Sequence, residues 1–191
     1  MSYVGDILSG LTALTAVTGA IVSVRKINEL KRQQVWQTRA KTAETALRAV
    51  IRVCSGLRAA CLTAEVAAEA YLAAVPGRIG EPDLRSLQQL LGQRLRSIAD
   101  STGPLDAELV EAQTAATIHL PKQALAVVLV RGSIVEIRED LNKLEQQLVD
   151  GGLTPEGTRI LGRLRVDRPS QLMDAEGVAQ DHLGPIARGE K

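Results

Sequence analysis

Histidine, cysteine and acidic side chains supply most acid–base, nucleophilic and metal chemistry, and in this chain they are widely scattered. The two histidines, His119 and His182, have no set of metal-ligating residues near them in the sequence. Cys54 and Cys61 would lie on the same face of one helix, about 10 Å apart, which is too far for a disulfide. We therefore interpret both cysteines as small buried apolar residues in a reducing compartment.

The acidic residues do not form a catalytic pattern either. The pattern places two groups of them on exposed helix faces: Asp106, Glu108 and Glu111, then Glu136, Glu139 and Asp140. No Glu-x-x-His pair faces inward, as a di-iron bundle would require. There is no Gly-rich phosphate loop and no Gly-x-Ser-x-Gly turn. We expect no enzymatic activity, no metal site and no cofactor.

The composition indicates the fold class and excludes one class of partner. The 191 residues carry a net charge of only +1, and the chain has no Phe, one Trp and two Tyr. So few aromatic rings and so little net charge argue against nucleic-acid binding. Ala and Leu dominate, which is typical of all-α proteins.

The most distinctive stretch runs from Ile7 to Val24 and contains eighteen residues without a charge. As a helix it would be about 27 Å long, close to the ~30 Å hydrocarbon core of a bilayer. No basic residue precedes the run, which argues against a signal peptide. Basic residues follow it, and the positive-inside rule then predicts a cytoplasmic body with the N-terminus outside.

This run has two different faces when it is drawn as a helix. The larger side chains cover one arc, which we predict to contact the membrane: Ile7, Leu8, Leu11, Leu14, Val17, Ile21, Val22 and Val24. Smaller side chains form the opposite strip, which we predict to contact another helix: Ser9, Thr12, Ala13, Ala16, Gly19, Ala20 and Ser23. Small residues at this spacing let membrane helices approach closely, so we expect a homo-oligomer. The alternative is a soluble bundle that buries the large arc.

A basic segment follows the apolar run. Residues 25–52 contain eight Lys or Arg and only two Glu. We predict that four of them contact lipid headgroups: Arg25, Lys26, Lys31 and Arg32. The alternatives are a solvated helix face, or pairing with acidic helices later in the chain.

A long helix is predicted from Arg25 to Val75, because this stretch has no proline and only one glycine. Steps of three and four residues along it mark a buried seam. The seam residues are Trp36, Ala40, Ala43, Leu47, Val50, Cys54, Leu57, Cys61, Ala64, Ala68, Tyr71 and Val75.

Three further helices follow in the prediction. One begins near Glu81, with an apolar face at Leu84, Leu87, Leu91, Leu95 and Ile98. Another begins near Leu105 and is kinked or broken at Pro121, which places His119 at a helix end. Beyond the proline the seam continues through Val130, Ile134, Ile137, Leu141, Leu144 and Leu148. This regular spacing favours a helix over a hairpin for residues 126–137.

A short helix over residues 155–166 is expected to cap the bundle. Residues 167–191 are polar and contain Pro169, Gly177, Gly184, Pro185 and Gly189, so we expect an extended or disordered tail. The predicted fold is an all-α antiparallel bundle of four to five helices. It divides into an apolar N-terminal helix (1–24), a helical bundle (25–166) and the tail.

This layout resembles HeLo-type cell-death domains, the four-helix executioner domain of MLKL, and their proposed bacterial counterparts, the Bell domains. Each has an apolar N-terminal helix that contains Gly and Ala and leads an all-α bundle of about this size. The resemblance covers the architecture of residues 1–150 and assigns no functional residue beyond the N-terminal helix. It implies regulated membrane insertion with permeabilisation as the output.

Two hypotheses of different class follow. In the first, the protein is a non-enzymatic, membrane-associated helical bundle whose N-terminal helix anchors in or inserts into the bilayer, with lipids as partners. In the second, it is a soluble scaffold or partner-binding protein that buries the same helix in its core. The first predicts a cytoplasmic protein attached to a membrane.

Overall fold

The protein is all-α. The structure is a computed structural model of the 191-residue chain, and every regular element in its described residues is a helix. The backbone is described for residues 3–74, 81–150 and 153–190, and side chains for residues 22–73, 84–148 and 153–190.

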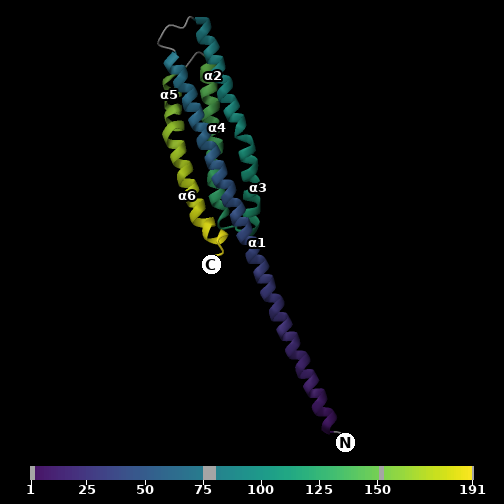
Figure 1. Ribbon diagram of the computed structural model, residues 1–191. Helices are drawn as coiled ribbons and strands as arrows, with labels where there is room; N and C mark the ends of the chain where they lie inside the picture. The colour runs from purple at the N-terminus through teal and green to yellow at the C-terminus, as the bar shows by residue number, and fades with distance from the viewer. Residues whose placement is uncertain (1–2, 75–80, 151–152, 191) are drawn as a thin grey trace.

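Helix α1, Tyr3–Ala74, is 72 residues long and is the axis of the molecule. Nothing in its sequence interrupts it, because the stretch after the apolar run has no proline and Gly56 as its only glycine. Figure 1 shows that only the C-terminal part of α1 lies among the other helices, while its N-terminal part leads away from them. The continuous helix predicted from Arg25 is confirmed as far as Ala74.

The seam predicted along α1 faces the core. Eight of its members are buried: Ala43, Val50, Cys54, Leu57, Cys61, Ala64, Ala68 and Tyr71. Trp36, Ala40 and Leu47 are half-buried. Val75 lies outside the described residues. Small side chains dominate this seam, so neighbouring helices can approach α1 closely along its length.

Helices α2, Glu81–Ser101, and α3, Gly103–His119, follow one another with a single residue between them. That residue, Thr102, is fully buried, and its hydroxyl donates to the Ala99 carbonyl at 2.7 Å. The same hydroxyl accepts from Nε of Arg138 at 3.1 Å. The hydroxyl therefore ties the α2–α3 junction to helix α4. As predicted, Leu91, Leu95 and Ile98 of α2 are buried.

Helix α4, Ala124–Asp150, begins after the turn that contains Pro121. The predicted break at this proline is confirmed, and His119 is the last residue of α3. Residues 126–137 are helical, so the hairpin alternative is wrong. All six predicted seam residues of α4 are buried: Val130, Ile134, Ile137, Leu141, Leu144 and Leu148.

The expectation of an extended or disordered C-terminal tail is wrong. Helix α5, Pro155–Gly162, continues through a π-helical turn, η1 at Arg163–Asp167, into helix α6, Arg168–Ala187. Leu172, Ala175, Ala179 and Leu183 are buried at helical spacing, and α6 packs extensively against α1. The prolines do not prevent this helix, because Pro169 lies in its first turn and Pro185 in its last, where few backbone hydrogen bonds are lost.

The helices pack side by side with their long axes nearly aligned (Figure 1). Helix α1 contacts α2, α3, α4 and α6, and α4 also contacts α2, α3 and α6. One cluster of buried side chains connects them all. The C-terminus lies at the same end of the bundle from which α1 emerges. The bundle thus includes α6 and leaves the first part of α1 outside.

Candidate functional site

We call residues 3–35 of α1 the arm, because they lead away from the bundle as one uninterrupted helix (Figure 1). From Val22 to Val35 every described side chain is exposed. Val22 is 63% exposed and Ile27, Leu30 and Val35 are each more than half exposed. These exposed apolar side chains make the arm a candidate contact surface.

Most of the predicted membrane-contacting and helix-contacting residues lie outside the described side chains. Of these two sets the structure describes Val22, Ser23 and Val24, and all three are exposed on the arm. The remaining members are Ile7, Leu8, Ser9, Leu11, Thr12, Ala13, Leu14, Ala16, Val17, Gly19, Ala20 and Ile21. Their backbone belongs to α1. Among the described residues, no helix is both long enough and apolar enough to cross a membrane.

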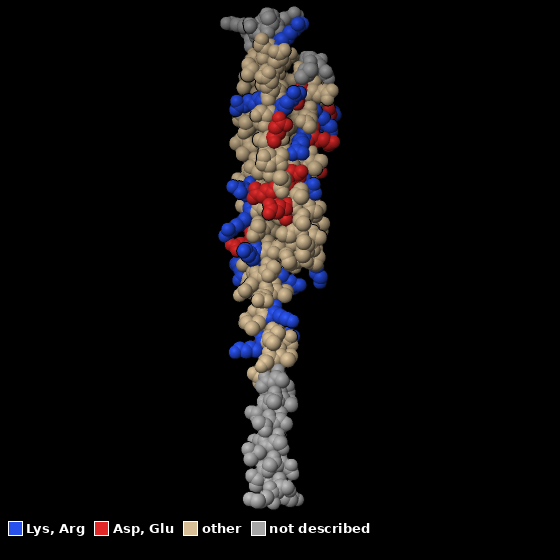
Figure 2. All heavy atoms as spheres, turned by 90° about the vertical axis from the view of Figure 1, so that its right-hand side faces the viewer, with Lys and Arg blue, Asp and Glu red and all other residues tan. Residues whose placement is uncertain are grey.

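The four predicted headgroup residues are all exposed on the same segment of the arm. Arg25 and Lys26 directly follow the apolar run, and Lys31 and Arg32 lie nearer the bundle. Glu29 is the one acidic residue among them. On the face shown in Figure 2, basic side chains lie along the described part of the arm, and acidic ones lie higher on the bundle. The arm is therefore suited to an anionic surface.

A second surface, which was not predicted from the sequence, lies where the arm leaves the bundle. Here Val35 and Arg39 of α1 line a hollow of about 430 Å³ together with Ile118 and His119 of α3. Ile118 is 69% exposed, the largest fraction among the described large apolar residues. One sequence signal could have indicated this surface: residues 30–43 and 112–135 contain no Asp or Glu.

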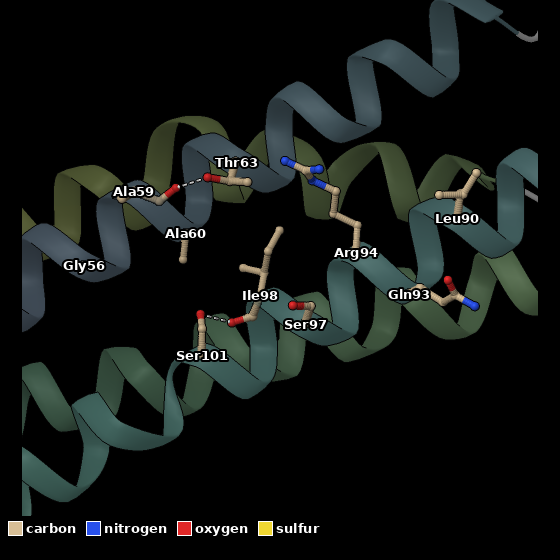
Figure 3. Close-up of a pocket in the computed structure, with 10 residues that line it drawn as sticks. All are labelled: Gly56, Ala59, Ala60, Thr63, Leu90, Gln93, Arg94, Ser97, Ile98 and Ser101. Carbon is tan, nitrogen blue, oxygen red and sulfur yellow. Dashed lines mark hydrogen bonds between the residues drawn. The ribbon is translucent and has the colours of Figure 1, made fainter.

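A groove between α1 and α2 is the other hollow of note, with a volume of about 610 Å³ (Figure 3). Two of its hydroxyl groups bond to their own helices: Thr63 donates to the Ala59 carbonyl at 2.7 Å, and Ser101 to the Ile98 carbonyl at 2.6 Å. Arg94 is the only ionisable side chain among the lining residues. These lining residues do not combine a nucleophile with a base, so we assign no chemistry to the groove.

The placement of Asp140 corrects the prediction of an exposed acid. Only 2% of this residue is exposed. Its Oδ1 accepts from Nη2 of Arg163 at 2.8 Å, and its Oδ2 accepts from Nε of Arg168 at 2.9 Å. Arg168 also pairs with Glu136. The cluster is nearly neutral and joins α4 to the C-terminal helices, so it serves the fold.

The two cysteines are buried and unpaired, as predicted. Burial raises the pKa of Cys54 and of Cys61 from 9.0 to about 11. A thiol with a raised pKa is a poor nucleophile near neutral pH. Among the described residues, no group of three His, Cys, Asp or Glu side chains could hold a metal ion.

Comparison with known protein families, with curated proteins and with solved structures gave no match. The arm, and the surface where it joins the bundle, form the candidate site on the evidence of their exposed apolar and basic side chains.

Proposed function

We propose that this protein is a non-enzymatic, membrane-associated antiparallel helical bundle whose arm anchors in or inserts into a bilayer. One observation carries the proposal: α1 continues without interruption from the packed core into the arm, where large apolar side chains are exposed. The arm's far end is the uncharged run from Ile7 to Val24. A rigid helix of this kind can hold a water-exposed bundle beside a bilayer.

The charge pattern supports the same proposal and gives it an orientation. Arg25 and Lys26 follow the apolar run directly, which favours a cytoplasmic bundle and an N-terminus outside. Each basic residue near an anionic membrane surface contributes about 1 kcal/mol of attraction. Helices of several copies would meet through the strip of small residues in the run.

Permeabilisation of the membrane is the output we propose, by resemblance to the HeLo and MLKL type of bundle. An assembly of several arms would bring their hydroxyl-bearing strips together inside the bilayer. Release of a dye from vesicles that contain the full chain, rising steeply with protein concentration, would support this part of the proposal. Vesicles that bind the protein and retain their dye would refute permeabilisation and leave anchoring unaffected.

Anchoring is tested by charge substitutions in the run. Leu11→Glu and Leu14→Glu place a carboxylate in the proposed hydrocarbon layer, which costs several kcal/mol at its centre. The wild-type chain should stay in the membrane pellet after an alkaline carbonate wash, and both variants should be released. Leu62→Glu, at a residue 60% exposed on the bundle, is the matched control and should behave as the wild type.

Two results would contradict anchoring. One is a pair of Leu11 and Leu14 variants that still pellet after the wash. The other is a wild-type chain that stays monodisperse in water without detergent and does not bind vesicles. This behaviour is expected of the alternative, a soluble scaffold.

A further inference from the structure

The end of the bundle from which the arm emerges carries exposed apolar side chains of its own. We call this surface the base and define it by Trp36 and Arg39 of α1, Ile118 of α3, Lys122 in the following turn, and Leu125 of α4. Ile118 is 69% exposed and Leu125 is 64% exposed. Trp36 is half-buried. Residues distant in sequence therefore gather at one end of the fold.

The base is also basic. The two segments that contain its residues, 30–43 and 112–135, have no Asp or Glu. Arg39 and Lys122 are exposed on the base, and Lys31 and Arg32 are exposed beside it on the arm. Exposed apolar side chains among basic ones, with a single tryptophan beside them, are typical of surfaces that lie in the headgroup layer of an anionic bilayer. The C-terminal turn at the same end carries one exposed acid, Glu190, whose charge is paired with Arg188 at 2.7 Å.

We propose that the base is a second membrane contact, made with anionic lipid headgroups, and this rests on the proposed function of the arm. Ile118 and Leu125 enter the headgroup layer, while Lys122 and Arg39 meet lipid phosphates. The contact fixes the orientation of the bundle on the membrane, which the arm alone leaves free.

The length of the arm determines how the contact is made. Trp36 lies twelve residues beyond Val24, about 18 Å along the helix. The headgroup layer extends only about 5–8 Å beyond the hydrocarbon core, so an upright α1 would hold the base clear of the lipid. A tilt of about 40° towards α3, at the upper end of the usual range, brings the end of α3 to about 7 Å from the hydrocarbon edge. The tilted run from Ile7 to Val24 then spans about 21 Å, so the bilayer must thin around the arm.

Trp36 is the only tryptophan in the chain and so reports on the base without labelling. The full chain is reconstituted in vesicles of neutral phosphatidylcholine, or of phosphatidylcholine with phosphatidylglycerol, each with or without a nitroxide-labelled headgroup. In the anionic vesicles we expect the headgroup nitroxide to quench the Trp36 emission. In neutral vesicles we expect weaker quenching.

A matched pair of variants assigns the signal to the base. The double variant Ile118→Glu with Lys122→Glu should lose the quenching while remaining in the alkali-washed pellet. The control, Leu62→Glu with Arg94→Glu, changes one exposed apolar and one exposed basic residue of a hollow between α1 and α2 and should keep the quenching.

The outcomes separate this inference from the proposed function. If the wild-type chain is inserted and the Trp36 emission is insensitive to the nitroxide in anionic vesicles, the base does not contact lipid. This result overturns the inference and leaves the proposed function of the arm unaffected. Equal quenching in both double variants also overturns it. A chain that is absent from the washed pellet overturns the proposed function of the arm as well.

Discussion

Arg168 at the start of α6 donates from its Nε to Oδ2 of Asp140 in α4, across 2.9 Å. Both side chains are largely enclosed, with 12% and 3% of their surface exposed. The π-helical turn explains why Arg163 shares this carboxylate. In a π turn the amide of residue i+5 bonds to the carbonyl of residue i, here Arg168 to Arg163, so the two side chains project towards the same side.

Removing the charge of Asp140 should therefore destabilise the fold. We expect Asp140→Asn to lower the free energy of unfolding by about 3 kcal/mol, because two arginines lose their buried partner. Arg163 keeps some contact with water and Arg168 keeps Glu136, which places the effect at the low end of the range. Urea unfolding followed by circular dichroism measures it. Glu139→Gln, at an exposed neighbour, is the control, and equal effects of the two substitutions would show that the cluster is unimportant.

The packing of α6 gives a second prediction. Leu172 is fully buried and its neighbour Met173 is 62% exposed. Leu172→Ala should cost about 2–5 kcal/mol of unfolding free energy, whereas Met173→Ala should change it by less than about 0.5 kcal/mol. Thermal or urea unfolding compares them. Two equally small effects would mean that residues 168–187 do not pack on the core.

The core seams of α1, α2 and α4 could be predicted from sequence because each is a regular series of apolar residues at steps of three and four. Helix α6 was missed because Pro169, Gly177 and Pro185 looked like breakers, although Leu172, Ala175, Ala179 and Leu183 keep the same spacing. Asp140 was misplaced for a related reason, since the helix that buries it was not predicted. The base could not be predicted, because Trp36, Ile118 and Leu125 are brought together only by the packing of α1, α3 and α4.

The buried thiols predict how stability depends on pH. Each thiol has a pKa of about 11 in the folded protein, against the ordinary value of 9.0 that applies to the unfolded chain. The folded protein therefore holds the thiol protons more tightly than the unfolded chain. The stabilisation is fully present below pH 9 and is lost as the pH rises towards 11. The variant carrying Cys54→Ala and Cys61→Ala should show a shallower decline over this interval. The same slope in both proteins would contradict the burial of the thiols.

Replacing Gly132 of α4 with alanine should stabilise the fold. A Cβ built on Gly132 meets nothing within 4 Å, so Gly132→Ala should raise the free energy of unfolding by roughly 0.5–1 kcal/mol through helix propensity alone. At Gly56 the added methyl would approach Cδ1 of Leu105 to 3.0 Å, so Gly56→Ala should gain less. Paired urea titrations measure both substitutions. A larger gain at Gly56 would contradict the close approach of α1 and α3.

Flotation with anionic vesicles, comparing the full chain with a chain that begins at Arg25, tests the role of the arm most directly. The shortened chain retains the described core, so its helical content and unfolding midpoint should be unchanged. The account predicts that the full chain floats with the vesicles and resists alkaline extraction, while the shortened chain stays in the aqueous fraction. If the two chains partition alike, or if the shortened chain unfolds because residues 1–24 belong to the core, the arm is not a membrane anchor.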